Sequence, residues 1–383
     1  MITRVQIKNF RSLADVDVSL NSLTVLVGKN GSGKSSFLDA LRFVRDALRL
    51  GLDNAIISRH GIDSLWRWAP TRNFNLQITI TIKTGGFHGE YGFTLARGKE
   101  TFHVKSEFCK CQRGNKIDSF EVKNGQLLVD IQSRNSALTP SRRDSVEKNV
   151  LTIPYLSVIS PLFSQLRHQL SGSFYSIFPN TLREPQIPST NSTLNDNADN
   201  LASIIQKIKS QNTWFEDLRT ALSMVTDGIS DINVKAVGKH LITELLHQDV
   251  KVSSRSVKEP WFSLAQESDG TLRMLGLLVA LYQKDNHSGL IALEEPELAL
   301  HPGALAVLSD VIREASKRRQ IIITTQSPDL ISRFEAEELR IVERQNGLTS
   351  IGLLDETQRS VIEDQLFSAG DLLRIEGLRS KSI

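Results

Sequence analysis

Cysteine is scarce in this sequence, and its two cysteines exclude the common cysteine-based sites. Cys109 and Cys111 are the only cysteines among 383 residues, and a single residue separates them. That spacing is too short for a zinc knuckle, and no other cysteine completes a set of ligands. We therefore expect two reduced thiols in a strand-rich stretch, as in cytoplasmic proteins, and neither a metal centre nor a disulfide framework.

Long apolar runs and a strong charge of one sign are also missing. No segment approaches the roughly 18–20 consecutive apolar residues of a membrane-spanning helix, and residues 1–5 do not lead into the apolar core of a signal peptide. The net charge is only +3, so charge alone does not indicate a dedicated nucleic-acid binder. With 40% apolar residues the chain can build a substantial core. We expect a soluble cytoplasmic protein with no membrane partner.

The first 50 residues show a strand, turn and helix pattern. Val16, Val18 and Leu20 alternate with polar residues, as in half-buried strands. Residues 23–27 form a compact apolar run that is typical of a buried strand. A glycine-rich turn follows, and residues 35–50 carry apolar side chains at helical spacing. The turn is therefore expected to connect a buried strand to a helix.

The rest of the chain alternates between strand-like and helical patterns. Residues 74–132 are rich in strands, with a hairpin signal at Asn124-Gly125. Residues 155–225 are helical, apart from a loop at 179–197 that is rich in proline, serine and asparagine. Strand patterns return at 229–252, and after residue 268 helices and strands alternate, which indicates a parallel sheet covered by helices. We predict one α/β domain over residues 1–383, made of N-terminal strands and a helix (1–50), a β-rich lobe (51–150), a helical insertion with strands (151–260) and a C-terminal α/β part (261–383).

The glycine-rich turn matches the phosphate-loop (Walker A) pattern G-x-x-x-x-G-K-[ST] at every position from Gly28 to Ser35. Glycines let several main-chain N–H groups converge on one phosphate, and the following helix points its positive N-terminus there. Lys34 is expected to reach the β- and γ-phosphates, and the Ser35 hydroxyl to coordinate Mg²⁺. A chance match is the alternative, but the strand before the turn and the helix after it favour an ATP site. The predicted nucleotide contacts here are Gly28, Asn30, Gly31, Ser32, Gly33, Lys34, Ser35 and Ser36.

Residues 290–296 form a strand-like apolar run that ends in two carboxylates, Glu294 and Glu295. Such an acidic strand end is the usual second half (Walker B) of an ATP site. Glu294 is predicted to hold the Mg²⁺ hydration shell opposite Ser35. Glu295 is predicted to orient and polarise the attacking water, and to act in catalysis together with Lys34. A solvated acidic turn is the alternative, which the phosphate loop in the same chain disfavours.

Two further polar turns have both a functional and a purely structural interpretation. Gln326 follows a buried-type strand at 321–325, and its amide would contact the γ-phosphate or the attacking water in catalysis. Ser327 would cap a helix at the same place, and the two roles are compatible. Residues 268–271, Ser-Asp-Gly-Thr, precede a strongly apolar helix and by themselves predict a helix N-cap.

The order of these motifs matches that of one ATPase family. Ile7-Lys8-Asn9-Phe10-Arg11-Ser12 comes first, followed by the phosphate loop, Ser268–Thr271, Glu294–Glu297, Leu300-His301-Pro302 and Thr325–Pro328. The sequence resembles the ABC-type ATPases of the structural-maintenance-of-chromosomes (SMC) and RecF branch. More narrowly, it resembles the stand-alone predicted ATPases of the AAA-fifteen and AAA-twenty-one types, relatives of the ATPase half of the overcoming-lysogenization-defect (OLD) proteins. The resemblance covers nearly the whole chain, with residues 50–260 matching only in outline.

The resemblance implies an α/β P-loop NTPase fold, namely an ABC-type ATPase head with a mixed or parallel sheet core, a β-rich lobe and a helical insertion. It also implies a homodimer that closes head to tail around ATP. Ser268 and Gly270 of one copy would meet the ATP bound to the other, at a helix N-terminus that favours the γ-phosphate. ATP would hold this dimer closed and hydrolysis would release it. Arg11 would approach the nucleotide from the N-terminal motif.

Two residues depart from the pattern of the family. Asp269 stands where a glycine is common, and it places a negative charge near phosphate unless it turns away as a helix cap. Gln326 stands where a histidine is usual. Glutamine can neither take up a proton nor become positively charged in catalysis, so we expect slow turnover. Gln186 is a loosely aligned candidate for the glutamine that couples the lobes of such ATPases.

The resemblance leaves the partner open. The first hypothesis is an ATP-driven switch that acts on a partner protein or a nucleic acid. Related ATPases often work with a nuclease in phage defence, and because the chain ends at Ile383 we expect any such effector to be a separate protein. The alternative is a RecF-like DNA-binding ATPase in DNA repair, and the Ser-Asp-Gly-Thr turn and long insertion disfavour a transporter subunit. Basic patches for DNA could be formed by Arg142, Arg143, Lys148, Lys207 and Lys209. Such charges more often belong to a solvated surface that binds nothing.

Overall fold

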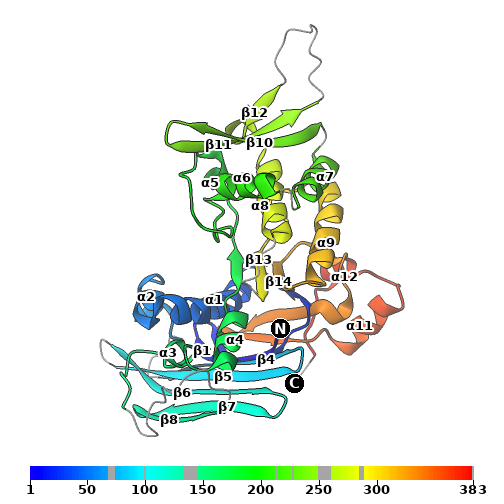
Figure 1. Ribbon diagram of the computed structural model, residues 1–383. Helices are drawn as coiled ribbons and strands as arrows, with labels where there is room; N and C mark the ends of the chain where they lie inside the picture. Colours follow the sequence, from blue (N-terminus) through cyan, green and yellow to red (C-terminus); the bar gives the residue numbers. More distant parts are fainter. Residues whose placement is uncertain are drawn as a thin grey trace. The chain divides into compact units, whose positions relative to one another are not determined.

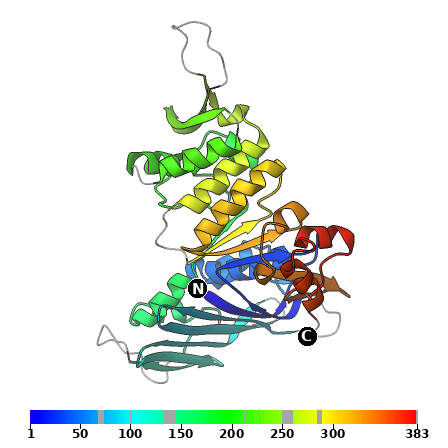
Figure 2. The ribbon, with the colours of Figure 1, turned by 90° about the vertical axis from the view of Figure 1, so that its right-hand side faces the viewer.

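The computed structural model describes residues 1–67, 74–98, 101–132, 145–211, 214–226, 228–248, 260–283 and 289–381. The chain divides into two compact units, whose elements are drawn in Figure 1 and Figure 2. The first unit holds the described residues of Met1–Gly172, His287–Leu290 and Glu335–Ile383. The second unit holds those of Ser173–Asn286 and Ile291–Phe334. Each unit therefore combines segments that are distant in the sequence.

The largest sheet of the first unit has seven antiparallel strands, which Figure 1 shows in blue to cyan. In spatial order they are β2 (Leu13–Ser19), β1 (Ile2–Phe10), β4 (Leu76–Thr84), β5 (Phe87–Arg97), β6 (Phe102–Arg113), β7 (Lys116–Lys123) and β8 (Gln126–Ile131). Val5 lies opposite Val18 on one side and Ile80 on the other, so alternating apolar residues build one buried face. The predicted hairpin is confirmed, because Asn124 and Gly125 connect β7 to β8 and both have positive φ.

A second group of strands in the first unit leads into the phosphate loop. The buried strand β3 (Leu23–Val27) pairs in parallel with β15 (Leu339–Gln345), which pairs antiparallel with β16 (Leu348–Gly352). Helix α1 (Lys34–Leu50) follows β3 and buries its apolar face, which confirms the predicted strand, turn and helix. The other helical segments of this unit are α2 (Leu52–Ile57), η1 (Ile62–Ser64), α3 (Ile153–Leu156), α4 (Pro161–Gln169), η3 (Ala336–Glu338), α11 (Glu356–Glu363) and α12 (Ala369–Ile375).

Two buried carboxylates fasten α3 and α4 to the seven-stranded sheet. Glu107 of β6 accepts hydrogen bonds from the N–H groups of Thr152 (2.6 Å) and Ile153 (3.1 Å). Asp118 of β7 accepts one from the hydroxyl of Ser160, which caps α4, at 2.5 Å. Burial raises the pKa of Glu107 from 4.5 to about 7, although these N–H groups favour its charged form.

The second unit holds three neighbouring strands, a separate three-stranded sheet and a set of helices. Strand β13 (Leu290–Glu294) lies between β14 (Gln320–Thr325) and β9 (Ser173–Tyr175), and it pairs in parallel with β9. The separate sheet is antiparallel, in the order β10 (Ile229–Val237), β11 (His240–His247) and β12 (Trp261–Ser263). Helix α8 (Asp269–Tyr282) is buried on all sides from Thr271 to Leu281, as expected of a helix that is apolar all round. The other helical segments are α5 (Pro179–Arg183), α6 (Leu201–Gln211), α7 (Phe215–Val225), η2 (Leu264–Gln266), α9 (Pro302–Ser316) and α10 (Pro328–Ile331).

Two elements of the second unit correct the sequence-based expectations. Residues 155–225 were expected to be helical, but β9 lies within them and extends the sheet beside β13. Three residues are too few to show the alternation by which a strand is recognised. The segment 179–197 was expected to be a loop, but its first residues form α5. Pro179 begins this helix, where a proline is tolerated because the missing N–H has no partner there anyway.

The cysteines lie in a strand, as the pattern around them predicted. Cys109 and Cys111 are both buried on β6, and their Sγ atoms are 3.6 Å apart.

In the described part of the chain, no helix combines the length and the apolar character that crossing a membrane requires.

Candidate functional site

The loop between β3 and α1 has a compact form that depends on its glycines. Gly31 and Gly33 have φ angles of 74° and 116°, in the left-handed region that favours glycine. A Cβ atom on Gly33 would lie 2.3 Å from the hydroxyl oxygen of Thr349, and one on Gly28 would lie 2.2 Å from the carbonyl oxygen of Val342. The loop therefore packs closely against β15 and β16, and only glycine fits at positions 28 and 33.

The ammonium group of Lys34 lies inside this loop. Its Nζ atom donates to the carbonyl of Gly28 at 2.7 Å and to that of Lys29 at 3.2 Å, and the residue is only 4% exposed. The hydroxyl of Ser32 is buried and has no hydrogen-bond partner among the residues that the structure describes. Helix α1 begins at Lys34, so its first N–H groups face the loop. A cation at a glycine-rich loop and a helix N-terminus form a cradle that suits phosphate oxygens.

The other side of the loop is held by side chains of β15 and β16. Arg344 donates from Nη1 to the carbonyl of Gly31 at 3.1 Å. The hydroxyl of Thr349 lies 2.7 Å from the carbonyl of Ser32 and 2.8 Å from the hydroxyl of Ser12. Because a trans peptide points its C=O and the following N–H in opposite directions, the Thr349 contact directs the N–H of Gly33 away from β16. The hairpin thus fixes the orientation of the loop's main chain.

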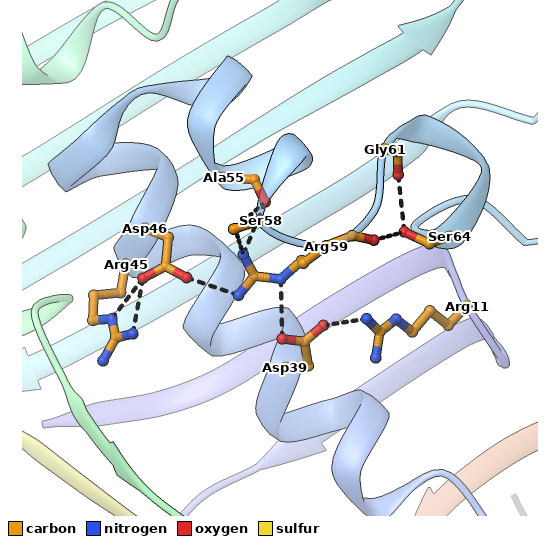
Figure 3. Close-up of polar contacts among 9 residues, drawn as sticks. All are labelled: Arg11, Asp39, Arg45, Asp46, Ala55, Ser58, Arg59, Gly61 and Ser64. Carbon is orange, nitrogen blue, oxygen red and sulfur yellow. Dashed lines mark hydrogen bonds and ion pairs between the residues drawn. The ribbon is translucent and has the colours of Figure 1, made fainter. Parts of the chain in front are cut away.

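Arg11, a predicted nucleotide contact, is part of a chain of ion pairs along α1, which Figure 3 shows. Its Nη2 atom lies 2.9 Å from Asp39, and the buried Arg59 joins Asp39 (3.0 Å) to Asp46 (2.8 Å). Arg45 pairs with the other oxygen of Asp46 at 2.8 Å. Arg11 has a positive φ of 50°, so its turn is tightly constrained next to the helix that follows the phosphate loop. Its direct contact with ATP stays a prediction.

The acidic strand end has a strained main chain at the predicted catalytic residue. Glu294 ends β13, and its side chain accepts a hydrogen bond from the hydroxyl of Ser176 at 3.2 Å. Glu295 has a φ of 42°, which costs a residue with a side chain about 1–2 kcal/mol. Its N–H donates to the carbonyl of Thr324 at 2.9 Å, and its carbonyl accepts from Nη2 of Arg273 at 2.8 Å. Hydrogen bonds to both the N–H and the carbonyl group of Glu295 therefore hold its strained conformation.

Glu297 and Arg273 belong to this cluster, although the motif did not assign them a role. Glu297 accepts from the hydroxyl of Thr325 at 2.5 Å and, at 3.4 Å, from the N–H of Gln326. Burial raises the pKa of Glu297. It therefore connects the acidic strand end to the turn that carries Gln326, and the repeated acid in Glu-Glu-Pro-Glu was the signal that could have identified it. Ser327 caps α10, which confirms the structural interpretation of that turn.

The turn before α8 is a helix N-cap, as predicted. Ser268 accepts a hydrogen bond from the N–H of Thr271 at 3.1 Å. A Cβ atom on Gly270 would lie 2.8 Å from the carbonyl oxygen of Ala299, so this position requires glycine. The carboxylate of Asp269 lies 2.6 Å from Nη2 of Arg183, on α5. The negative charge that departs from the family pattern is thus paired within the same chain.

Some residues considered from the sequence have local structural contacts. The amide of Gln186 donates to the carbonyl of Ala198 and accepts from the N–H of Ala202, which fixes the start of α6. Lys209 lies 3.2 Å from the carbonyl of Ile232. Lys148 and Lys207 are exposed, and Arg142 and Arg143 lie outside the described residues.

The predicted site residues thus gather into two sets, one in each unit. The first unit holds the phosphate loop and Arg11, and the second holds the acids, Gln326 and the Ser268 turn. That the two sets meet on one nucleotide stays a prediction. Within the described part of the chain, no group of three or more histidine, cysteine, aspartate and glutamate residues could hold a metal ion. The oxygen ligands predicted for Mg²⁺, Ser35 and Glu294, are of a kind that fits a hard cation, and their joint role stays a prediction.

Two family models match parts of this chain. Residues 1–84 match the one described as "AAA ATPase domain". Residues 158–332 match the one described as "AAA domain, putative AbiEii toxin, Type IV TA system". The two matches cover the phosphate loop and the acidic strand end respectively.

The curated relatives include nucleases. The chain is 26% identical to an OLD nuclease of Thermus scotoductus over 362 residues, covering 90% of this chain and 62% of that protein. It is 23% identical to the Old nuclease of Escherichia phage P2, with 90% and 60% covered, and 18% identical to endonuclease GajA of Bacillus cereus, with 89% and 57% covered. The chain therefore spans about 60% of the length of these relatives.

Solved structures with a similar fold include SMC heads. One is an SMC head bound to the C-terminal winged-helix domain of ScpA, with a TM-score of 0.56 and 15% identity, covering 93% of this chain and 99% of that one. Another is the SMC head of Pyrococcus furiosus with an extended coiled coil, with a TM-score of 0.54 and 14% identity, covering 95% and 99%. The predicted fold class, an α/β ATPase head, is confirmed.

Proposed function

Because the chain is an ABC/AAA-type ATPase related to the OLD family, we propose that it binds ATP and Mg²⁺ at the phosphate loop and hydrolyses the nucleotide as a molecular switch. The observation that carries this proposal is the form of the loop. Its glycines leave no room for a Cβ at positions 28 and 33, and Lys34 is held inside it by carbonyls. On binding, phosphate oxygens would replace those carbonyls as partners of the ammonium group.

In the proposed reaction the chain positions a water molecule against the γ-phosphate. Glu295 accepts a proton from that water while the water oxygen bonds to phosphorus, and the bond between the γ-phosphorus and the bridging oxygen of ADP breaks. Lys34 and the loop's N–H groups balance the charge on the phosphates, and Gln326 contacts the water or the γ-phosphate. Ser35 and Glu294 would hold Mg²⁺, which would supply a positive charge next to the phosphates. Turnover would be slow, because Gln326 does not transfer protons.

We further propose that two copies close head to tail around ATP. The N-terminus of α8, with Ser268 and Gly270, would bind the γ-phosphate on the second copy. Support comes from Arg183, which pairs with Asp269 and so reduces the repulsion between that carboxylate and phosphate. The close packing of Gly270 on Ala299 leaves the N-cap with a fixed form.

The partner on which this switch acts would be a protein, such as a nuclease, or a nucleic acid, and phage defence is the proposed setting. Support comes from the relatives, which are named OLD nuclease and endonuclease GajA. The RecF-like alternative of a DNA-repair ATPase has less support, because Lys209, one of its proposed basic residues, also contacts Ile232 and Asn233.

The proposed activity is tested by comparing three variants of the phosphate loop and the acidic end. Lys34→Ala should weaken ATP binding about 100-fold or more, because it removes the cation inside the loop. Glu295→Gln should keep ATP binding, lower phosphate release by about 10²–10⁴-fold and accumulate an ATP-dependent dimer. Lys29→Ala, at an exposed lysine of the same loop, is the control and should stay close to wild type. Unchanged phosphate release in Glu295→Gln would rule out its catalytic role.

Mixed dimers test the head-to-tail arrangement. Lys34→Ala and Ser268→Arg chains should each be inactive alone, and a mixture should regain activity because one complete composite site forms. A mixture as inactive as its components would contradict the shared site.

A further inference from the structure

Arg273 is a buried cation directly behind the predicted catalytic acids. It lies on α8, little more than one turn after Ser268, and only 6% of it is exposed. Its Nη2 atom donates to the carbonyl of Glu295 at 2.8 Å and approaches the carbonyl of Glu294 at 3.5 Å. Burial lowers the pKa of Arg273, while the charges of Glu297 and Glu295 act in the opposite direction.

A guanidinium kept only for stability would have its donors satisfied. The Nε atom of Arg273 is buried without a hydrogen-bond partner among the described residues, and so is the Oε2 atom of Glu297 in the same cluster. Neutral side chains of similar volume generally fill a core at less cost than a buried, partly satisfied charge. The charge of Arg273 therefore calls for a role other than packing.

The contact of Arg273 falls on the most strained point of the acidic end. Glu295 has a left-handed φ of 42°, and its peptide groups are held by Thr324 on the N–H side and by Arg273 on the carbonyl side. These contacts on both peptide groups fix the main chain of Glu295, and with it the direction in which its Cα–Cβ bond leaves the strand end. Gly270 packs on Ala299 a few residues further along, which makes a second contact between α8 and the same segment.

Building on the proposed function, we propose that Arg273 is a positioning residue: it reaches from α8, the helix that follows Ser268, to the carbonyls of Glu294 and Glu295 and holds the acids of its own chain in the orientation needed for hydrolysis. The helix that would meet the partner's nucleotide thereby also sets the acids that act on the chain's own nucleotide. Arg273 itself touches neither ATP nor water in this arrangement.

The first experiment separates binding from turnover in homodimers. Arg273→Met, of similar length but uncharged, should lower kcat at least tenfold and leave the Kd for ATP within about twofold of wild type. Arg273→Lys should recover part of the lost kcat, since an ammonium group can still donate to one carbonyl. Arg340→Lys is the matched control, because Arg340 is a buried guanidinium whose partners include the main-chain carbonyls of Ser19, Glu337 and Leu339 in the other unit. If Arg273→Met does not fold, Arg273→Lys alone should show at least a threefold lower kcat, and full activity of the folded Lys variant would overturn the proposal.

The second experiment distinguishes positioning from general damage to α8. Dimers are assembled from two differently tagged chains, one of which carries Lys34→Ala, so that only one chain binds ATP. Arg273→Met in the ATP-binding chain should abolish most of the activity, whereas Arg273→Met in the Lys34→Ala chain should leave it nearly unchanged. Equal losses in both arrangements would show that Arg273 only stabilises the helix, and would overturn the proposal. A wild-type chain without ATPase activity would instead overturn the proposed function itself.

Discussion

The phosphate loop and the acidic strand end both hold main chain in left-handed conformations, but they do so by different means. In the loop, the positive φ angles fall on Gly31 and Gly33, for which they carry little strain. At the acidic end the positive φ falls on Glu295, whose side chain carries the proposed catalytic role, and neighbouring groups compensate for the strain. The difference suggests a division of labour: glycines let the loop take the shape that its proposed phosphate contacts need without strain, whereas the proposed catalytic acid is placed at some energetic cost.

The largest effect is expected in the loop, where two glycines with positive φ have different surroundings. Gly33→Ala combines an unfavourable φ with a contact of 2.3 Å to Thr349, whereas a Cβ on Gly31 meets nothing within 4 Å. We expect Gly33→Ala to destabilise the first unit by about 2–4 kcal/mol and to weaken ATP binding more than 100-fold. Gly31→Ala should cost only about 1 kcal/mol. Thermal unfolding and nucleotide titration would measure both, and equal effects would show that close packing against β16 does not matter.

The two units can also be compared through their buried glutamates. Glu107 and Glu297 are both buried and both have a raised pKa, but Glu107 fastens α3 to a sheet and Glu297 lies beside the predicted catalytic acids. The same physical feature therefore serves structure in one unit and accompanies the candidate site in the other.

The pH dependence of stability tests the structural glutamate. The pKa of Glu107 is about 7 in the folded chain against an ordinary 4.5, so between these values the folded state binds more protons than the unfolded state. The free energy of unfolding must then fall as pH rises from 4.5 to 7, by roughly 3 kcal/mol at most. The side chain of Glu107→Gln cannot titrate, so the variant does not lose this stability as the pH rises. The unfolding free energy of the variant relative to that of wild type should therefore increase from pH 4.5 to pH 7. Urea unfolding at several pH values measures it.

Two outcomes would decide between the structural and the functional interpretation of Glu107. Parallel stability curves of wild type and Glu107→Gln would contradict the raised pKa. ATPase activity of the folded Glu107→Gln variant should equal that of wild type, whereas Glu297→Gln should lower it, because only Glu297 contacts the turn of Gln326.

Sequence reasoning succeeded where the physical cause lies within a short segment. The run into the phosphate loop, the hairpin at Asn124 and Gly125 and the cap at Ser268 each depend on a few consecutive residues, and all three are confirmed. It was wrong at β9 and α5, which are too short for their periodicity to be read. The pairing of β1 with β4 could not be predicted either, because strand pairing is settled by tertiary packing.

The candidate site shows the same limit. The motifs identified the loop and the acids, but their assigned roles stay predictions. Arg273 and Glu295 are 22 residues apart, and Glu297 and Thr325 are 28 apart. No pattern in a single sequence specifies such pairs, since a buried arginine on an apolar helix shows neither its partner nor its depth.

The smallest effect is expected at the turn of residues 268–271, where it tests whether Arg183 compensates the negative charge of Asp269. Arg183 and Asp269 are partly exposed, so their pair is worth only about 0.5–1 kcal/mol. In a Glu295→Gln background, Arg183→Gln should therefore weaken the ATP-dependent dimer roughly two- to fivefold, because the carboxylate of Asp269 would repel phosphate. The loss should shrink in 1 M salt, and Arg183→Gln combined with Asp269→Asn should restore the affinity. Sedimentation with ATP measures all three. A double variant as weak as Arg183→Gln alone would mean that Arg183 acts through its contact with the carbonyl of Glu267, and not through charge.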